Sequence, residues 1–176
     1  MLRAFLLFLL IATPVQAQDT RTNAAFYTQR ALEFCIRNYG TPEAMIPAFK
    51  SAGYSETIED FGGEKIHWMA APGNIVNVLV QARPGESYCA ISTEAFGVTD
   101  ALPFVGQVLD LIFNGDIFYQ SPEGQVIQPG SPLANQTSCT GYHFFAPQRL
   151  IWVQLASVGN DPVCIENGTA QIMVRM

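Results

Sequence analysis

Charged residues are scarce in this sequence, and long apolar runs are nearly absent. Asp, Glu, Lys and Arg make up only 14% of the 176 residues, against 49% hydrophobic residues, a balance that excludes an intrinsically disordered chain. The only long apolar run is N-terminal, which excludes a multi-pass membrane protein. We expect one compact domain, because a chain of this size buries about two thirds of its unfolded surface.

Basic residues are missing from a long internal stretch. Between Arg83 and Arg149 there is no Lys or Arg. Six carboxylates lie in this stretch: Glu86, Glu94, Asp100, Asp110, Asp116 and Glu123. A negative field repels nucleic acid and anionic lipid, so neither is an expected partner. The field would favour a cationic protein, although sparse negative charge also serves solubility alone.

The N-terminus has the pattern of a secretory signal peptide. Arg3 precedes the apolar run 4–13, and Val15 and Ala17 offer small residues to a signal peptidase. An apolar run of about ten residues is too short to span roughly 30 Å of hydrocarbon. We expect cleavage after residues 1–17, export to the periplasm or exterior of a bacterium, and no stable membrane anchor after processing. The mature domain, 18–176, would carry a net charge of −7, because the removed segment contains one Arg and no acid.

Two segments of the chain resemble each other. Residues 67–89 and 143–164 both run from a His through a Pro-containing turn and an apolar strand to a Cys, with His67 opposite His143 and Cys89 opposite Cys164. This similarity suggests two repeated halves, 23–97 and 98–176. Two unrelated hairpins with the same turn chemistry would also look alike, so both interpretations stay open.

The four cysteines contain no Cys-x-x-Cys spacing, which argues against a thioredoxin-type redox site or a zinc knuckle. Export would deliver them to an oxidising compartment, where two disulfides are expected. Four cysteines allow three pairings. One bridge in each half is the most economical arrangement, and it predicts the pairs Cys35–Cys89 and Cys139–Cys164.

Hydrophobic periodicity predicts an α+β fold. The expected order is two N-terminal helices, an antiparallel meander, one buried helix that is apolar nearly all round, and a second set of antiparallel strands. The helices are expected near 23–38, 41–53 and 99–113. The strands are expected near 66–71, 75–82, 88–94, 141–146, 150–157, 163–165 and 169–174. The acidic, Gly-rich stretch 55–65 is expected to be a loop.

The two histidines, His67 and His143, are the natural candidates for chemistry. Two imidazoles with a carboxylate could hold a metal, or one could act as a general base. Metal sites usually show His at short spacing, however, and this chain has none, so no metal or cofactor is expected. Strand-edge histidines that bond to the backbone are the simpler interpretation.

Signatures of nucleophilic catalysis and phosphate binding are missing, including Gly-x-Ser-x-Gly, Ser-x-x-Lys and a Gly-rich loop ending in Lys-Ser or Lys-Thr. The leading interpretation is therefore an exported, soluble, disulfide-stapled protein of the binding or envelope-associated kind, rather than an enzyme. Two alternatives stay open: a small periplasmic hydrolase or metal-dependent enzyme that uses His67 and His143, and an inhibitor-like protein that docks a cationic partner through its acidic half. The expected partner is a cationic protein or a small molecule.

Overall fold

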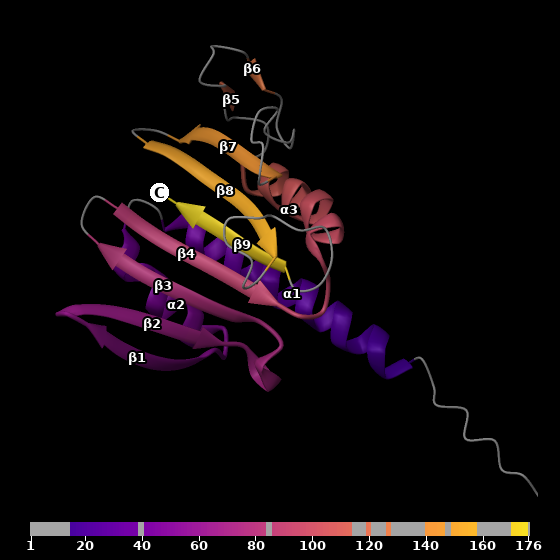
Figure 1. The fold of residues 1–176 in the computed structure, drawn as a ribbon, viewed down its shortest axis with the longest axis horizontal. Coiled ribbons are helices and arrows are strands. Elements are labelled where there is room, and N and C mark those ends of the chain that lie inside the picture. Colours follow the sequence, from indigo (N-terminus) through magenta and orange to yellow (C-terminus); the bar gives the residue numbers. More distant parts are fainter. Residues whose placement is uncertain are drawn as a thin grey trace, which may run out of the picture.

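A computed structural model describes residues 15–38, 41–83, 86–113, 119–120, 126–127, 140–146, 149–157 and 170–175 (Figure 1). The helices in this part of the chain are α1 (Val15–Arg37), α2 (Met45–Ser51) and α3 (Val98–Phe113), with the short 3₁₀ helices η1 (Pro42–Ala44) and η2 (Pro72–Asn74). The strands are β1 (Ser55–Phe61), β2 (Glu64–Ala70), β3 (Asn77–Arg83), β4 (Glu86–Thr93), β5 (Tyr119–Gln120), β6 (Val126–Ile127), β7 (Thr140–Ala146), β8 (Arg149–Ser157) and β9 (Ala170–Arg175).

Seven of these strands form one antiparallel sheet in the order β1-β2-β3-β4-β9-β8-β7, and β5 pairs with β6 separately. The expected α+β class is confirmed, and the two expected sets of strands belong to the same sheet. They meet where β4 pairs with β9, with Ile91 opposite Ile172. The last strand of the chain therefore lies at the centre of the sheet and joins the two meanders.

The two meanders differ in register. In the first hairpin, the partner of Val78 lies two residues after His67. In the second hairpin, the partner of Val153 lies one residue before His143. An alignment that superimposes the two histidines therefore does not superimpose the two valines in space, because the connection between β2 and β3 is longer than that between β7 and β8. The expected repeat of the two halves, 23–97 and 98–176, stays a prediction.

The core lies between the sheet and the helices. Alternate residues of the central strands are buried, as expected where one sheet face packs against helices: Val76, Val78, Val80, Cys89, Ile91, Ile151, Val153, Leu155, Ala170, Ile172 and Val174. Figure 1 shows α1 and α2 behind the sheet in this view. Phe49 of α2 is fully buried and stacks edge-to-face on Phe34 and Tyr54. Burial raises the pKa of the Tyr54 hydroxyl, which donates a hydrogen bond to the backbone carbonyl of Tyr27.

One of the two expected disulfides is confirmed. Cys35 of α1 bonds to Cys89 of β4, and both side chains are fully buried; the Sγ of Cys89 lies 3.7 Å from the sulfur of Met45. The bridge therefore links the first helix to the middle of the sheet. Cys139 and Cys164 lie outside the described residues, and their pairing stays a prediction.

The expectation that residues 55–65 form a loop is wrong. These residues form β1 and the start of β2, joined by the two-residue turn Gly62-Gly63, with Phe61 paired to Glu64. Both glycines have positive φ, 64° and 91°, which matches the right-handed twist of a tight hairpin and which residues with a side chain rarely adopt. Gly-Gly between two alternating segments is itself a hairpin signal, but the high acidity of the segment obscured it.

Two helix expectations also need correction. The first helix begins at Val15 and not near 23, so it runs through the expected cleavage point. An ion pair of 2.7 Å between Arg21 and Asp100 ties this start to α3. The third helix is buried on one face only, because Leu111 is 70% exposed. Nowhere in the described ranges is a helix long and apolar enough to cross a membrane.

Candidate functional site

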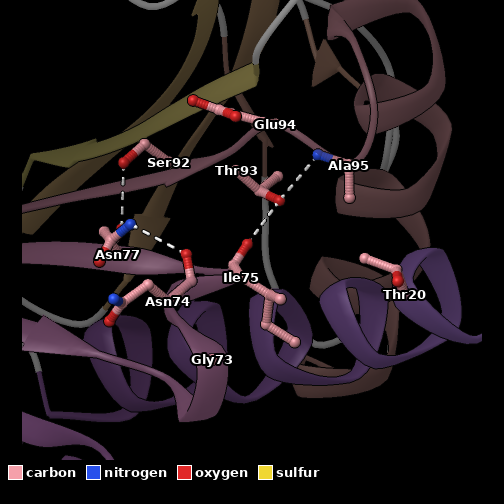
Figure 2. Close-up of a pocket in the computed structure, with 9 residues that line it drawn as sticks. All are labelled: Thr20, Gly73, Asn74, Ile75, Asn77, Ser92, Thr93, Glu94 and Ala95. Atoms are coloured by element: carbon pink, nitrogen blue, oxygen red, sulfur yellow. Dashed lines mark hydrogen bonds between the residues drawn. The ribbon is translucent and has the colours of Figure 1, made fainter.

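A pocket lies at one end of the sheet, where three segments of the chain converge (Figure 2). Its volume is about 590 Å³, within the usual range for small-molecule sites. One wall comes from the start of α1, a second from the loop between β2 and β3, and a third from the end of β4 and the residues after it. The lining residues are Thr20, Gly73, Asn74, Ile75, Asn77, Ser92, Thr93, Glu94 and Ala95.

Hydrogen bonds hold two of these walls together. The Thr93 hydroxyl donates to the Ile75 carbonyl at 2.8 Å and accepts the backbone N–H of Ala95 at 3.2 Å. The Ser92 hydroxyl donates to the carbonyl of Asn77, again across the two strands. Figure 2 shows the Thr93–Ile75 and Ser92–Asn77 bonds crossing between the walls. The shape of the pocket is therefore set before any ligand arrives, which lowers the ordering cost of binding.

The residues of the loop between β2 and β3 account for its shape. Pro72 occupies the start of η2, where its fixed φ is favourable, and Gly73 takes a positive φ of 71°. Asn74 follows at φ 55° and is the only non-glycine residue with positive φ in the described part of the chain. Asn tolerates this conformation better than most residues, and its side chain is left exposed beside the pocket.

The pocket has a distinct polarity. Its nine described lining residues include two carboxamides, three hydroxyls and one carboxylate, and none of the nine is Lys, Arg or His. The hydroxyls of Ser92 and Thr93 already donate within the walls and keep only acceptor capacity for a ligand, whereas the amide of Asn77 also donates there and keeps one N–H. The Glu94 carboxylate is exposed and forms no hydrogen bond or ion pair within the described part of the chain. Such a lining suits a neutral or cationic ligand that carries several hydrogen-bond donors. An anion would meet no countercharge and one like charge.

His67 lies away from the pocket, in strand β2 of the β1–β2 hairpin. Its Nδ1 lies 2.7 Å from Oε1 of Glu56, and Oε2 of the same carboxylate lies 2.8 Å from the ammonium of Lys50. The hydrogen bond from Lys50, reinforced by that from His67, holds the pKa of Glu56 below its usual value. This cluster joins α2 to β1 and β2, and no hydroxyl or thiol nucleophile is shown within it.

The sheet does not bring the two histidines together. His67 is in β2 and His143 is in β7, and four strands, β3, β4, β9 and β8, lie between them. Five interstrand steps of about 4.8 Å place these two strands roughly 24 Å apart. His67 is not among the described residues that line the pocket. A site that uses both imidazoles on one substrate is therefore not formed by this arrangement.

The acidic half of the sequence is spread over several places. Asp100 pairs with Arg21, Glu94 lines the pocket, and Asp110 is exposed on α3. Asp116 and Glu123 lie outside the described residues. Among the described side chains, no three of the types His, Cys, Asp and Glu are grouped so that they could hold a metal ion.

The pocket was not predictable from sequence, because its residues come from three separate segments, at position 20, at 73–77 and at 92–95, which only the fold brings together. Comparison with known proteins adds no function: no family model, curated protein or solved structure matches this chain.

Proposed function

We propose that this protein is an exported, non-catalytic binding protein that holds a small, neutral or cationic, hydroxyl- or amine-rich molecule in the pocket between α1, the β2–β3 loop and the end of β4. The observation that carries the proposal is the described lining itself: hydrogen-bonding groups, one carboxylate without an ion-pair partner among the described residues, and no Lys, Arg or His among the nine residues. Ile75 and Ala95 add a small apolar surface on which the carbon face of such a molecule can pack.

Export is supported by the N-terminal pattern and by the buried disulfide, which is typical of proteins that fold in an oxidising compartment. The intact mass of the protein recovered from the culture medium or periplasm tests this part. We expect a chain that begins at Gln18. A chain that still begins at Met1 and stays in the cytoplasm would contradict it.

The pocket is tested with three probes that share one pyranose ring and differ in charge: glucosamine, glucose and glucuronate. In titration calorimetry of the mature chain at neutral pH, we expect glucosamine to bind roughly tenfold more tightly than glucose, because a charge-assisted hydrogen bond to Glu94 adds about 1.5 kcal/mol. Glucuronate is expected to bind least. No heat of binding for any probe at about 10 mM, or a preference for glucuronate, would contradict the proposal.

Two variants test whether the preference for glucosamine over glucose depends on Glu94. Glu94→Gln keeps the size of the side chain and removes its charge, so glucosamine is expected to fall to the level of glucose. Asp110→Asn removes an equally exposed carboxylate on α3, outside the pocket, and is expected to change nothing. Equal losses in both variants would show that the overall negative charge, and not the pocket, attracts the cation.

A further inference from the structure

The β1–β2 hairpin is a second surface with unusual properties. β1 is the outermost strand of the sheet and pairs with β2 along all seven of its residues. No described strand pairs with its other side. A strand paired on one side leaves alternate N–H and C=O groups directed outward, where they can pair with another extended chain. We call this outer side of Ser55–Phe61 the β1 edge.

Large apolar side chains are concentrated here. Ile58 is 50% exposed, Phe61 is 68% exposed, and Trp68 of β2 is 39% exposed. Within the described residues only two other large hydrophobic side chains, Phe26 and Leu111, are comparably exposed. The β1 edge therefore offers both unpaired backbone groups and apolar contacts, the combination that strand addition uses.

The charges of β1 are all of one sign. It carries Glu56, Glu59 and Asp60 and no basic residue. Glu56 is already bound by Lys50 and His67, and Asp60 accepts the backbone N–H of Gly63 in the hairpin turn. The Glu59 carboxylate is exposed and, within the described part of the chain, has no hydrogen bond or ion pair.

The acidic residues of β1 distinguish between the possible binding partners of the β1 edge. If two copies of β1 paired antiparallel with full overlap, Glu56 of each would face Asp60 of the other, and opposed like charges destabilise a strand pair. Exposed edges are often protected by Lys or Pro, and β1 has neither. A second copy is therefore disfavoured, whereas a basic segment would gain charge complementarity.

We propose that the β1 edge binds an extended segment of another protein in which basic residues alternate with apolar ones. The segment adds as an eighth strand beside β1, with its basic side chains on the sheet face that carries Glu59 and its apolar side chains on the opposite face, against Ile58. This interaction is independent of the pocket, which lies where β3 begins and β4 ends and includes no residue of β1 among its described lining.

The test uses labelled heptapeptides in fluorescence anisotropy with the mature protein. The first alternates lysine with valine; in the second the valines are kept and every backbone nitrogen is methylated, a change that, like proline, keeps the charge but removes the N–H groups that pair strands; in the third the lysines are replaced by glutamate. We expect only the first to bind. Equal binding of the methylated peptide would reduce the interaction to charge attraction and overturn the proposal, as would no binding of the first peptide.

Two charge reversals locate the contact. Glu59→Lys is expected to weaken the lysine–valine peptide about tenfold, whereas Asp110→Lys on α3 leaves it unchanged, both with unaltered thermal unfolding. Amide hydrogen exchange in Ser55–Phe61 is expected to slow when the peptide is added. Equal weakening by both variants, or exchange already slowed by dimerisation of the free protein, would contradict the assignment.

Discussion

Cys35 of α1 and Cys89 of β4 form a disulfide in which both side chains are fully buried. The bond closes a chain segment of 54 residues, which contains α2 and the whole of β1, β2 and β3. It therefore attaches the first helix to the centre of the sheet and encloses the hairpin that carries the β1 edge.

Removing this bridge is expected to be costly. Closing a loop of that length stabilises the folded state by about 4 kcal/mol in the chain-entropy description. The double variant C35A/C89A is expected to lose an amount of that order in urea denaturation, measured under conditions that leave the other two cysteines oxidised. A loss below about 1 kcal/mol would show that the bridge contributes little to stability.

Phe49 and Leu111 form a matched pair for the packing of the helices. Phe49 is fully buried between α1, α2 and the sheet, whereas Leu111 is largely exposed on α3. Phe49→Ala is expected to lower the free energy of unfolding by about 3–5 kcal/mol because it leaves a cavity, and Leu111→Ala by less than about 0.5 kcal/mol. Similar losses in the two variants would mean that α3 is buried in solution by something that covers Leu111.

Much of the fold was predictable from local signals, and the exceptions have physical causes. Strands were expected near 75–82 and 150–157, where β3 and β8 lie, because burial of one face leaves a strong period of two. β1 was missed because an edge strand exposed on nearly every residue carries almost no such period. The second helix was expected over 41–53, whereas α2 begins at Met45, which places Pro47 in its first turn, where no intrahelical N–H bond is lost.

The candidate site was less predictable than the fold. His67 and His143 stood out because histidine is rare in this chain, but the sheet order, which sequence periodicity does not reveal, separates them. The pocket residues are common types, such as Asn, Ser and Thr, which appear at every turn. Only the pairing of β3 with β4 brings Asn77 opposite Ser92 and so creates the wall.

Glu56 gives the fold a dependence on pH. Its pKa is lowered in the folded state, mainly by the hydrogen bond from Lys50, so its contribution to stability is full above the ordinary carboxyl pKa. That contribution is lost as the pH falls from about 4.5 through the lowered pKa. Glu56→Gln is expected to be less stable than the wild type at pH 7, by under about 1 kcal/mol, with the difference shrinking toward pH 3. Glu59→Gln is the control and is expected to show no such difference. A stability difference between Glu56→Gln and the wild type that grows as the pH falls would contradict a lowered pKa of Glu56 in the folded state.

The Gly62-Gly63 turn is expected to tolerate Asn better than Ala. No atom lies within 4 Å of a Cβ built on Gly62, so a substitution there changes backbone conformation and not packing. At its φ of 64°, Ala is expected to cost about 1 kcal/mol and Asn clearly less, because Asn adopts the left-handed region more readily. Thermal unfolding of G62A and G62N measures the difference. Equal stability of the two variants would mean that the turn relaxes.

The central claim is that the pocket beside Asn74 and Glu94 binds a ligand, and chemical-shift mapping of the mature protein during titration with glucosamine tests it most directly. We predict that the backbone amide signals of residues 73–77 and 92–95 shift in a saturable manner, that those of Ser55–Phe61 do not, and that Glu94→Gln weakens the response. Shifts that are absent, or spread evenly over the exposed carboxylates, would contradict the assignment of this pocket as the binding site.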